Sequence, residues 1–322
     1  MLEVRNLKKA YGDRKILDDV SFSTEKGRIY GFLGPNGTGK STTMNLITGY
    51  LSPGGGDILI NEISMIKNPA RAKKHIGYLP EQPPLYPDLT VSENLDFAAE
   101  LKGITGSTKK KEMARVSELA GLGSVQRHMI KQISKGYKQR VALAQALLGD
   151  PELIILDEPS SGLDPRQIVE MRELVRQLGR EHTVIFSTHS LSEVENLCDH
   201  ILMLYGGKLV ADDTPDELVR KHNDRQRIRL VIRGNSTKAD AAMEKNGRIE
   251  SHRILREDAE SCTIEVTAFP GQDIRESISK TCMEEGYGIL EMVSRQMNLE
   301  EVYLKLTGAD YALREDRDES GI

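Results

Sequence analysis

Eight residues near the N-terminus have the types and spacing that bind phosphate groups. The stretch Gly34-Pro35-Asn36-Gly37-Thr38-Gly39-Lys40-Ser41 fits the pattern G-x-x-x-x-G-K-[ST], and Thr42 adds a second hydroxyl. Glycines let successive backbone N–H groups converge on an anion, and the positive end of a following helix adds to the attraction. The lysine can reach the β- and γ-phosphates of a nucleotide, and the serine hydroxyl can bind Mg²⁺. Pro-Asn-Gly also suits a plain turn, but an apolar strand before the loop and a helix after it favour phosphate binding.

Two adjacent carboxylates follow a second apolar run. Asp157 and Glu158 come directly after residues 153–156, Leu-Ile-Ile-Leu. In open α/β sheets, ligands bind beyond the carboxyl ends of the strands. Asp157 can hold Mg²⁺ directly or through water, and Glu158 can polarise a water for in-line attack on the γ-phosphate. An acidic loop would explain the pair if it stood alone, but beside a phosphate-binding loop we interpret it as functional.

The elements that must position these residues alternate between strands and helices. Short strands are expected over residues 2–4 and 16–22, and buried strands over 29–33, 153–156, 183–187 and 200–204. Helices are expected over 42–49 and 166–179, and a mostly helical stretch over 90–149 begins with the capping box Thr90-Val91-Ser92-Glu93. This alternation predicts an α/β fold with a largely parallel sheet.

The sequence pattern changes after residue 222. Strands are expected over 227–233, 249–255, 262–268 and 288–294, with helices near 238–246, 273–285 and 299–306. The order βαββαβ predicts a small ferredoxin-like α+β domain. We therefore predict a nucleotide-binding domain over residues 1–222 with a helical subdomain at about 90–149, an accessory domain over 227–308, and a disordered tail over 309–322.

Composition limits the classes of function. The chain has 322 residues, long enough for two domains, and a formal net charge of −5, which argues against nucleic acid as a partner. Its three scattered cysteines fit a reducing compartment rather than a disulfide framework. No apolar run reaches the roughly 18–20 residues of a membrane helix, and the N-terminus does not read as a signal peptide.

The sequence resembles the ATP-binding subunit of an ABC transporter over residues 1–218, because six short motifs of that family occur in the expected order. Beyond the two motifs above, the resemblance implies that Tyr11 stacks on adenine, that the switch residue His189 contacts the γ-phosphate, and that Ser161-Gly162-Leu163-Asp164 touches another protomer. The sixth motif, the family signature, occupies residues 133–137. Alone, Tyr11 suits a core aromatic and His189 a structural hydrogen-bonding group. The agreement in order and spacing favours the functional interpretation.

The signature departs from the common Leu-Ser-Gly-Gly-Gln. Here Lys135 and Tyr137 replace a glycine and the glutamine, whereas Ser134 and Gly136 remain. Ser134 could be only a helix N-cap, but Ser134 and Gly136 at a helix start can also form a second anion site, where the charge of Lys135 can assist. In the family this site faces the phosphate loop of an opposing protomer.

A second departure concerns the metal. Where many members carry a metal-contacting glutamine, this sequence has Glu81 with Gln82 next to it. Either side chain can touch Mg²⁺ or water, and we favour Glu81. The resemblance thus implies a metal site made of Ser41, Asp157 and Glu81.

The resemblance also implies a function. Two ATP molecules would be held in a head-to-tail dimer whose closure and hydrolysis drive a separate membrane permease from the cytoplasmic face of the cell membrane, and no nucleic acid is expected. The variations resemble a branch of multidrug, antibiotic and polysaccharide-type exporters and related gliding or copper-maturation systems, which commonly ends in such an α+β extension. That extension could regulate, hold a partner or brace the core.

Two rival functions stay open. The alternative is a soluble ABC-type ATPase acting on nucleic acid or ribosomes, although such proteins usually carry long coiled coils, zinc-binding cysteine clusters or two cassettes. A regulatory module that binds nucleotide without turnover is disfavoured by the presence of both Glu158 and His189.

Overall fold

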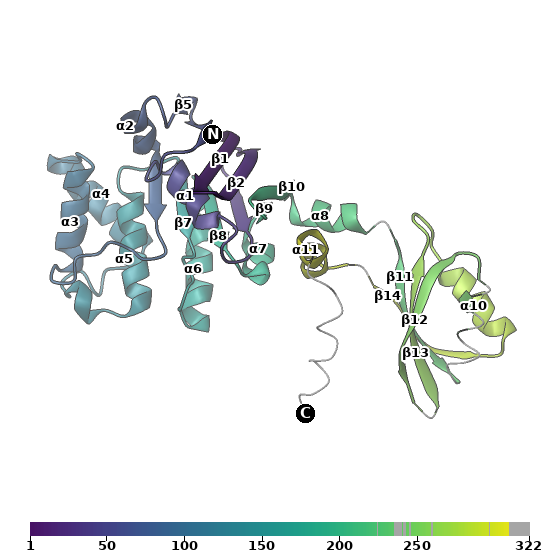
Figure 1. The fold of residues 1–322 in the computed structure, drawn as a ribbon. Coiled ribbons are helices and arrows are strands. Elements are labelled where there is room, and N and C mark those ends of the chain that lie inside the picture. The colour runs from purple at the N-terminus through teal and green to yellow at the C-terminus, as the bar shows by residue number, and fades with distance from the viewer. Residues whose placement is uncertain are drawn as a thin grey trace. The chain divides into compact units, whose positions relative to one another are not determined.

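The chain divides into two compact units, Met1–Pro215 and Asp216–Ile322, each of which is described here by itself. The computed structural model describes residues 1–223, 225–234, 240, 243–244, 246–258, 260–295 and 297–308 (Figure 1). The segment 309–322, for which disorder is expected, lies outside these residues. Within the described part, no helix is long and apolar enough to cross a membrane.

The first unit is built on a six-stranded sheet with the order β10-β9-β3-β8-β7-β6. Its strands are β3 (Ile29–Leu33), β6 (Ile76–Leu79), β7 (Leu153–Asp157), β8 (Thr183–Thr188), β9 (His200–Tyr205) and β10 (Lys208–Asp213). All neighbouring pairs are parallel except β10 with β9. Strands β3, β7 and β8 are buried along their whole length, which explains why apolar residues do not alternate with exposed polar ones in their sequences. The expected largely parallel sheet is confirmed.

A second, antiparallel sheet packs on the first. It has the order β2-β1-β4-β5 and consists of β1 (Leu2–Tyr11), β2 (Arg14–Ser23), β4 (Gly55–Ile60) and β5 (Ile63–Ser64). The two sheets share one apolar core, in which the rings of Phe22 and Phe32 lie 5.9 Å apart. The first two strands were expected, but their membership of a separate sheet depends on contacts distant in sequence.

Helices flank the sheets of the first unit. They are α1 (Lys40–Ile47), α2 (Pro69–Ala72), α3 (Val91–Leu101), α4 (Gly106–Leu119), α5 (Lys135–Leu147), α6 (Pro165–Leu178) and α7 (Leu191–Leu197). Helices α3, α4 and α5 contact one another, and we call this group of helices the helical subdomain (Figure 1). The capping box is confirmed, since Thr90 Oγ1 accepts from the N–H of Glu93 and Glu93 accepts from the N–H of Thr90. Helix α1 begins two residues earlier than expected, directly after Gly39.

The second unit contains a four-stranded antiparallel sheet with the order β12-β13-β11-β14. Its elements are α8 (Pro215–His222), β11 (Arg227–Arg233), β12 (Ile249–Glu257), β13 (Ser261–Ala268), α10 (Arg275–Glu284), β14 (Gly288–Arg295) and α11 (Leu299–Thr307). Buried side chains of β11 and β13 share a core with Ile278 and Cys282 of α10. Much of the helix expected over 238–246 lies outside the described residues, so the ferredoxin-like assignment stays a prediction.

Candidate functional site

The phosphate-binding motif forms the turn between β3 and α1, as its sequence predicts. Gly39 is the N-cap of α1 and has a φ of 106°, a backbone conformation that other residues rarely adopt. A Cβ atom at Gly34 would overlap the carbonyl oxygen of Leu204 on β9. Both glycines are therefore required by the path of the chain. That path directs the first, unpaired N–H groups of α1 toward the loop.

Lys40 is buried beneath this loop, with 6% of its surface exposed. Its Nζ donates to the carbonyl oxygens of Gly34, at 2.6 Å, and Pro35, at 3.3 Å. The Nζ also lies 3.9 Å from Glu158 Oε1. Burial lowers the pKa of Lys40, and the neighbouring carboxylates oppose that shift. The ammonium is thus held by weak neutral acceptors at the place where an anionic phosphate would be a stronger partner.

Asp157 ends β7 and is almost fully buried, with 3% of its surface exposed. Its Oδ1 has no hydrogen-bond partner among the described residues. Burial raises the pKa of this carboxyl, and the charge of Glu81 adds to the effect, whereas the hydroxyls of Ser187 and Ser41 and the charge of Lys40 oppose it. A buried carboxylate oxygen without a partner fits a cation, and Mg²⁺ prefers oxygen ligands.

The same region does not contain a complete metal site made of side chains. In the part of the chain that the structure describes, no three His, Cys, Asp or Glu side chains are grouped so that they could hold an ion. Mg²⁺ therefore fits here only with hydroxyl and phosphate oxygens as additional ligands, as Ser41 and a nucleotide would supply.

Glu158 follows Asp157 with an unusual positive φ of 49°. Its N–H donates to the carbonyl oxygen of Ser187, and its Oε2 lies 2.9 Å from Nδ1 of His189. The Glu158 side chain is 13% exposed, while that of His189 is 64% exposed. Burial raises the pKa of Glu158, and His189 and Lys40 pull it back. A carboxylate whose pKa is raised accepts a proton more readily than an ordinary one, as a general base must.

Lys40, Glu158 and His189 line one cleft of about 500 Å³, whereas the buried Asp157 is not among its lining residues. The cleft brings together residues from β2, the phosphate loop, the start of α1 and the loops after β6, β7 and β8: Arg14, Ile16, Asn36, Gly37, Gly39, Lys40, Ser41, Thr42, Glu81, Glu158, Ser161 and His189. Arg14 and Ile16 were missed by sequence reasoning, since they have no motif and reach the cleft only through the packing of β2.

Of the site residues expected from sequence, Tyr11 lies apart from the cleft and Glu81 lines it. Tyr11 does not line this cleft; it is half exposed at the end of β1, with Lys9 Nζ 5.4 Å from its ring centroid. Glu81 lines the cleft, whereas Gln82 lines only an adjoining cavity of about 490 Å³, which Glu81 shares. That Glu81 rather than Gln82 contacts the metal stays a prediction.

The signature residues lie apart from the cleft. Ser134 is the N-cap of α5, and its Oγ accepts from the N–H of Tyr137 at 3.4 Å. Gly136 packs closely against α6, because a Cβ there would lie 2.8 Å from the side chain of Gln167. Ser134 and Gly136 line a separate cavity of about 320 Å³. One chain therefore does not bring its signature to its own phosphate loop.

The expected dimer loop, residues 161–164, contributes Ser161 to the lining of the cleft and Leu163 to the lining of the signature cavity. The N–H of Ser161 donates to the carbonyl oxygen of Glu158, and Asp164 is the N-cap of α6 through a capping box with Gln167. Lys135 Nζ lies where a side chain on Gly162 would stand. The added charge in the signature thus lies beside Gly162 of its own chain, and its assistance to the anion site stays a prediction.

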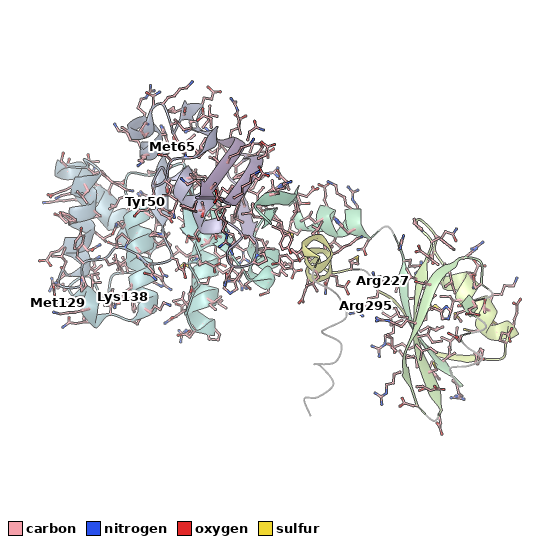
Figure 2. All side chains as sticks on the ribbon, in the orientation of Figure 1. Tyr50, Met65, Met129, Lys138, Arg227 and Arg295 are labelled. Atoms are coloured by element: carbon pink, nitrogen blue, oxygen red, sulfur yellow. The ribbon has the colours of Figure 1, made fainter. Side chains whose placement is uncertain are left out.

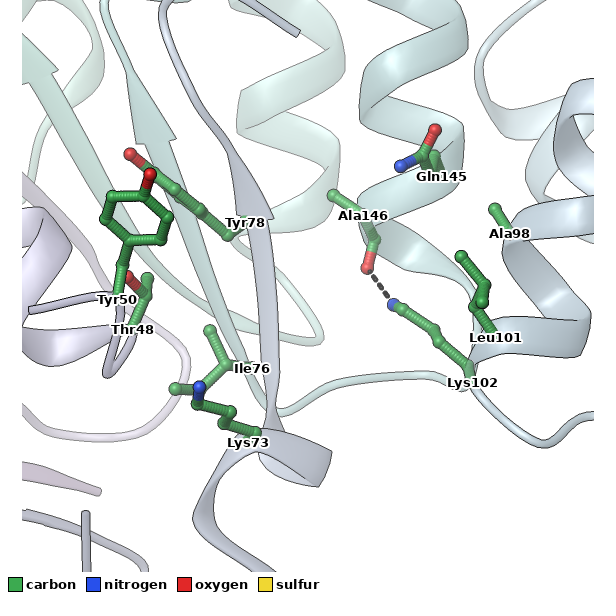
Figure 3. A pocket seen from close by; sticks show the side chains of 10 residues that line it. All are labelled: Thr48, Tyr50, Lys73, Ile76, Tyr78, Ala98, Leu101, Lys102, Gln145 and Ala146. Atoms are coloured by element: carbon green, nitrogen blue, oxygen red, sulfur yellow. Dashed lines mark hydrogen bonds between the residues drawn. The ribbon is translucent and has the colours of Figure 1, made fainter. Parts of the chain in front are cut away.

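A further cavity of about 380 Å³ opens between the α/β core and the helical subdomain (Figure 3). Its wall on the core side includes Tyr50 and Tyr78, and its wall on the helical side includes Leu101 and Lys102. Tyr50 and Leu101 are 80% and 73% exposed. Lys102 Nζ donates to the carbonyl oxygen of Ala146 at 2.9 Å. The cavity is thus an exposed, partly apolar depression, away from the phosphate loop.

A glycine loop at the end of the parallel strand β3, a lysine beneath it and carboxylates at the end of β7, which is separated from β3 by β8, define a P-loop nucleoside triphosphatase. Residues 17–161 match the family described as ABC transporter. The linearmycin resistance ATP-binding protein LnrL of Bacillus subtilis is 34% identical over 309 residues, covering 96% of this chain and 98% of the relative. The bacitracin transport ATP-binding protein BcrA of Bacillus licheniformis is 35% identical over 310 residues, covering 96% and 97%.

Solved structures agree. One described as the ATP binding subunit of an ABC transporter is 33% identical, with a TM-score of 0.63, and the match covers 69% of this chain and 92% of that one. A dimeric ATP-binding cassette in a post-hydrolysis state, bound to ADP and Pi, is 27% identical with a TM-score of 0.61, covering 66% and 98%. The chain belongs to the ABC transporter ATP-binding proteins, and it is an ATPase whose hydrolysis powers transport.

Proposed function

We propose that the chain is the ATP-hydrolysing subunit of an exporter whose membrane permease is a separate protein. Similarity over nearly the whole length to proteins named for linearmycin resistance and bacitracin transport supports export of a toxic or antibiotic-like compound. The observation that carries the ATPase role is the position of Glu158, 3.9 Å from Lys40 Nζ and 2.9 Å from His189 Nδ1 in one cleft.

Each residue of the cleft would have a defined task. The N–H groups of residues 34–42 and the Lys40 ammonium would hold the β- and γ-phosphates, where they stabilise the charge that develops during transfer. Ser41, Asp157 and Glu81 would hold Mg²⁺, which neutralises phosphate charge when bound. Glu158 would accept a proton from the attacking water, while His189 orients Glu158 and contacts the γ-phosphate.

A second ATPase subunit would complete the site. Ser134 and Gly136 line a cavity distinct from the cleft of the same chain, so their anion site is available to a nucleotide on another chain. The similar cassette solved as a dimer supports this arrangement. The Ser161–Asp164 loop would lie at the contact, because Ser161 also lines the cleft.

The permease would dock on the depression between the core and the helical subdomain, whose lining includes Tyr50, Tyr78 and Leu101. Its partly apolar walls and the highly exposed Tyr50 and Leu101 suit a short amphipathic helix. Docking there would keep the chain on the cytoplasmic face of the membrane.

The test is a pull-down of the tagged chain from gently solubilised membranes, with a Tyr50→Ala, Leu101→Ser double variant as the matched control. We expect a polytopic membrane protein with the wild type and its loss with the variant, at unchanged basal ATP turnover. Ribosomes or nucleic acid as the main partner would instead support the soluble alternative.

A further inference from the structure

The sheet of the second unit has one covered face and one open face. On β11, the side chains buried in the core beside α10 are Ile228, Leu230 and Ile232. Because successive side chains of a strand point to opposite faces, Arg227, Arg229 and Arg233 lie on the other face. Figure 2 shows Arg227 and Arg295 on the side of the sheet away from α10.

Six arginines share this open face, which we call the arginine face. The strand register places them in neighbouring rows of β11, β12 and β14: Arg227, Arg229, Arg233, Arg253, Arg256 and Arg295. Of the described residues that the same register places on this face, two are acidic, Glu265 and Glu291. The arginine face is therefore strongly positive in a chain whose formal net charge is −5.

The positive charge is only partly compensated within the sheet. Arg227 stands directly opposite Arg295, an arrangement of like charges that destabilises a strand pair. Glu265 lies 3.2 Å from Arg253 and 3.9 Å from Arg295, and Asp258 lies 3.2 Å from Arg256. For Arg229 and Arg233, no acidic group lies within 4.0 Å in the described part of the chain. A face that keeps Arg229 and Arg233 without an acidic partner in the described part of the chain favours an additional anion.

The chemistry of the arginine face favours carboxylates over nucleic acid. Sheets that bind single-stranded RNA stack the bases on aromatic side chains. The described residues that the register places on this face include no aromatic one. The planar guanidinium instead matches the two oxygens of a carboxylate. A peptide rich in Asp and Glu is the ligand that these features select.

Such a peptide occurs in the same chain. Residues 309–322 contain two arginines and five acidic residues: Asp310, Glu315, Asp316, Asp318 and Glu319. This acidic segment follows α11, whose Glu301 lies 3.7 Å from Arg295 of the arginine face. At about 3.3 Å per residue, fourteen residues reach roughly 46 Å, whereas the nine-residue strand β12 spans about 30 Å.

We propose that the arginine face binds the acidic segment 309–322 of its own chain. The tether gives the segment an effective concentration on the order of millimolar, so several weak, salt-sensitive ion pairs are sufficient. The bound segment then excludes other anionic partners from the face. This inference concerns the second unit and is independent of the export proposal.

The test uses full-length chains and a fluorescein-labelled peptide with the sequence of residues 309–322. One chain is wild type, and the other carries Glu315→Gln, Asp316→Asn, Asp318→Asn and Glu319→Gln. At low salt we expect the peptide, followed by fluorescence anisotropy, to bind the neutralised chain about tenfold or more tightly than the wild type, whose own segment competes. Adding Arg229→Glu and Arg233→Glu to the neutralised chain should abolish that gain.

The control is Lys280→Glu, which reverses an exposed charge on α10, on the covered side of the sheet. It should leave peptide binding unchanged, and circular dichroism verifies that every variant is folded. Equal peptide affinity for the two chains, no binding to either, or equal losses with Lys280→Glu and the arginine variants would overturn the proposal. Tight binding of phosphatidylserine vesicles or of poly-uridine RNA to the wild-type arginine face would overturn it too, because the face would then be open.

Discussion

At the scale of single residues, the chemistry of the cleft depends on Glu158. Replacing it with Gln keeps its shape and removes the base, so we expect ATP turnover to fall about 100-fold or more while ATP binding is retained. The measurement is phosphate release beside equilibrium nucleotide binding. Because burial raises the pKa of Glu158, its ionised form is the costly one in the folded state. The folded protein therefore loses stability as the pH rises above 4.5 and through the raised pKa of Glu158. The Gln variant has no ionised form and avoids this cost, so it should unfold at an equal or higher temperature at pH 7.5. Unchanged turnover would remove Glu158 from the mechanism.

The pair Glu158–His189 makes a second prediction, on pH. A raised pKa places the acidic limb of the turnover profile above 4.5, the ordinary value for glutamate. His189 lowers the pKa of Glu158, so His189→Ala should move that limb to still higher pH, besides lowering the maximum. Turnover measured from pH 5 to 9 in wild type and variant tests this, and Ser192→Ala, on the exposed start of α7, is the control. A limb that does not move would mean that the imidazole has no electrostatic effect on Glu158.

At the scale of elements, the turn from β3 to α1 tolerates no side chain at Gly34. A methyl group there would overlap the Leu204 carbonyl, so Gly34→Ala should displace the loop, weaken ATP binding and cost about 1–3 kcal/mol of unfolding free energy. Gly123→Ala is the matched control, because a Cβ at Gly123 meets nothing within 4 Å. Chemical unfolding and nucleotide titration give the two quantities. Equal effects of both substitutions would contradict the argument from close packing.

At the scale of the whole molecule, the separation of the signature from the cleft predicts complementation between chains. Lys40→Ala and Ser134→Arg should each be inactive alone, the first through its own cleft and the second through the site it offers to a partner. In an equal mixture, half of the dimers are mixed and hold one intact site of two, so about a quarter of the wild-type ATP turnover should return. Turnover per chain should also rise with protein concentration. Full activity of the Ser134 variant by itself would show that one chain is sufficient.

The sequence by itself determined most of the local structure around the site. The pattern of glycines with Lys40 and Ser41, the unbroken apolar run before it and the Asp157–Glu158 pair specify their own backbone environment, since glycine conformations, helix starts and buried strands are local properties. The same holds for the capping box at Thr90 and for the alternation along β11. The phosphate loop and the Asp157–Glu158 pair were also among the motifs that carried the resemblance to the family, which the comparisons confirmed.

Only the tertiary structure decided which distant segments meet. It placed β1 and β2 in a separate antiparallel sheet, brought Arg14 and Ile16 into the cleft and set Lys135 against Gly162. It also gathered arginines from three strands on one face, although they are scattered over nearly seventy residues of sequence. Such contacts depend on strand register and on packing between sheets. Both are set by the total burial of apolar surface across the chain, which no short pattern of residues encodes.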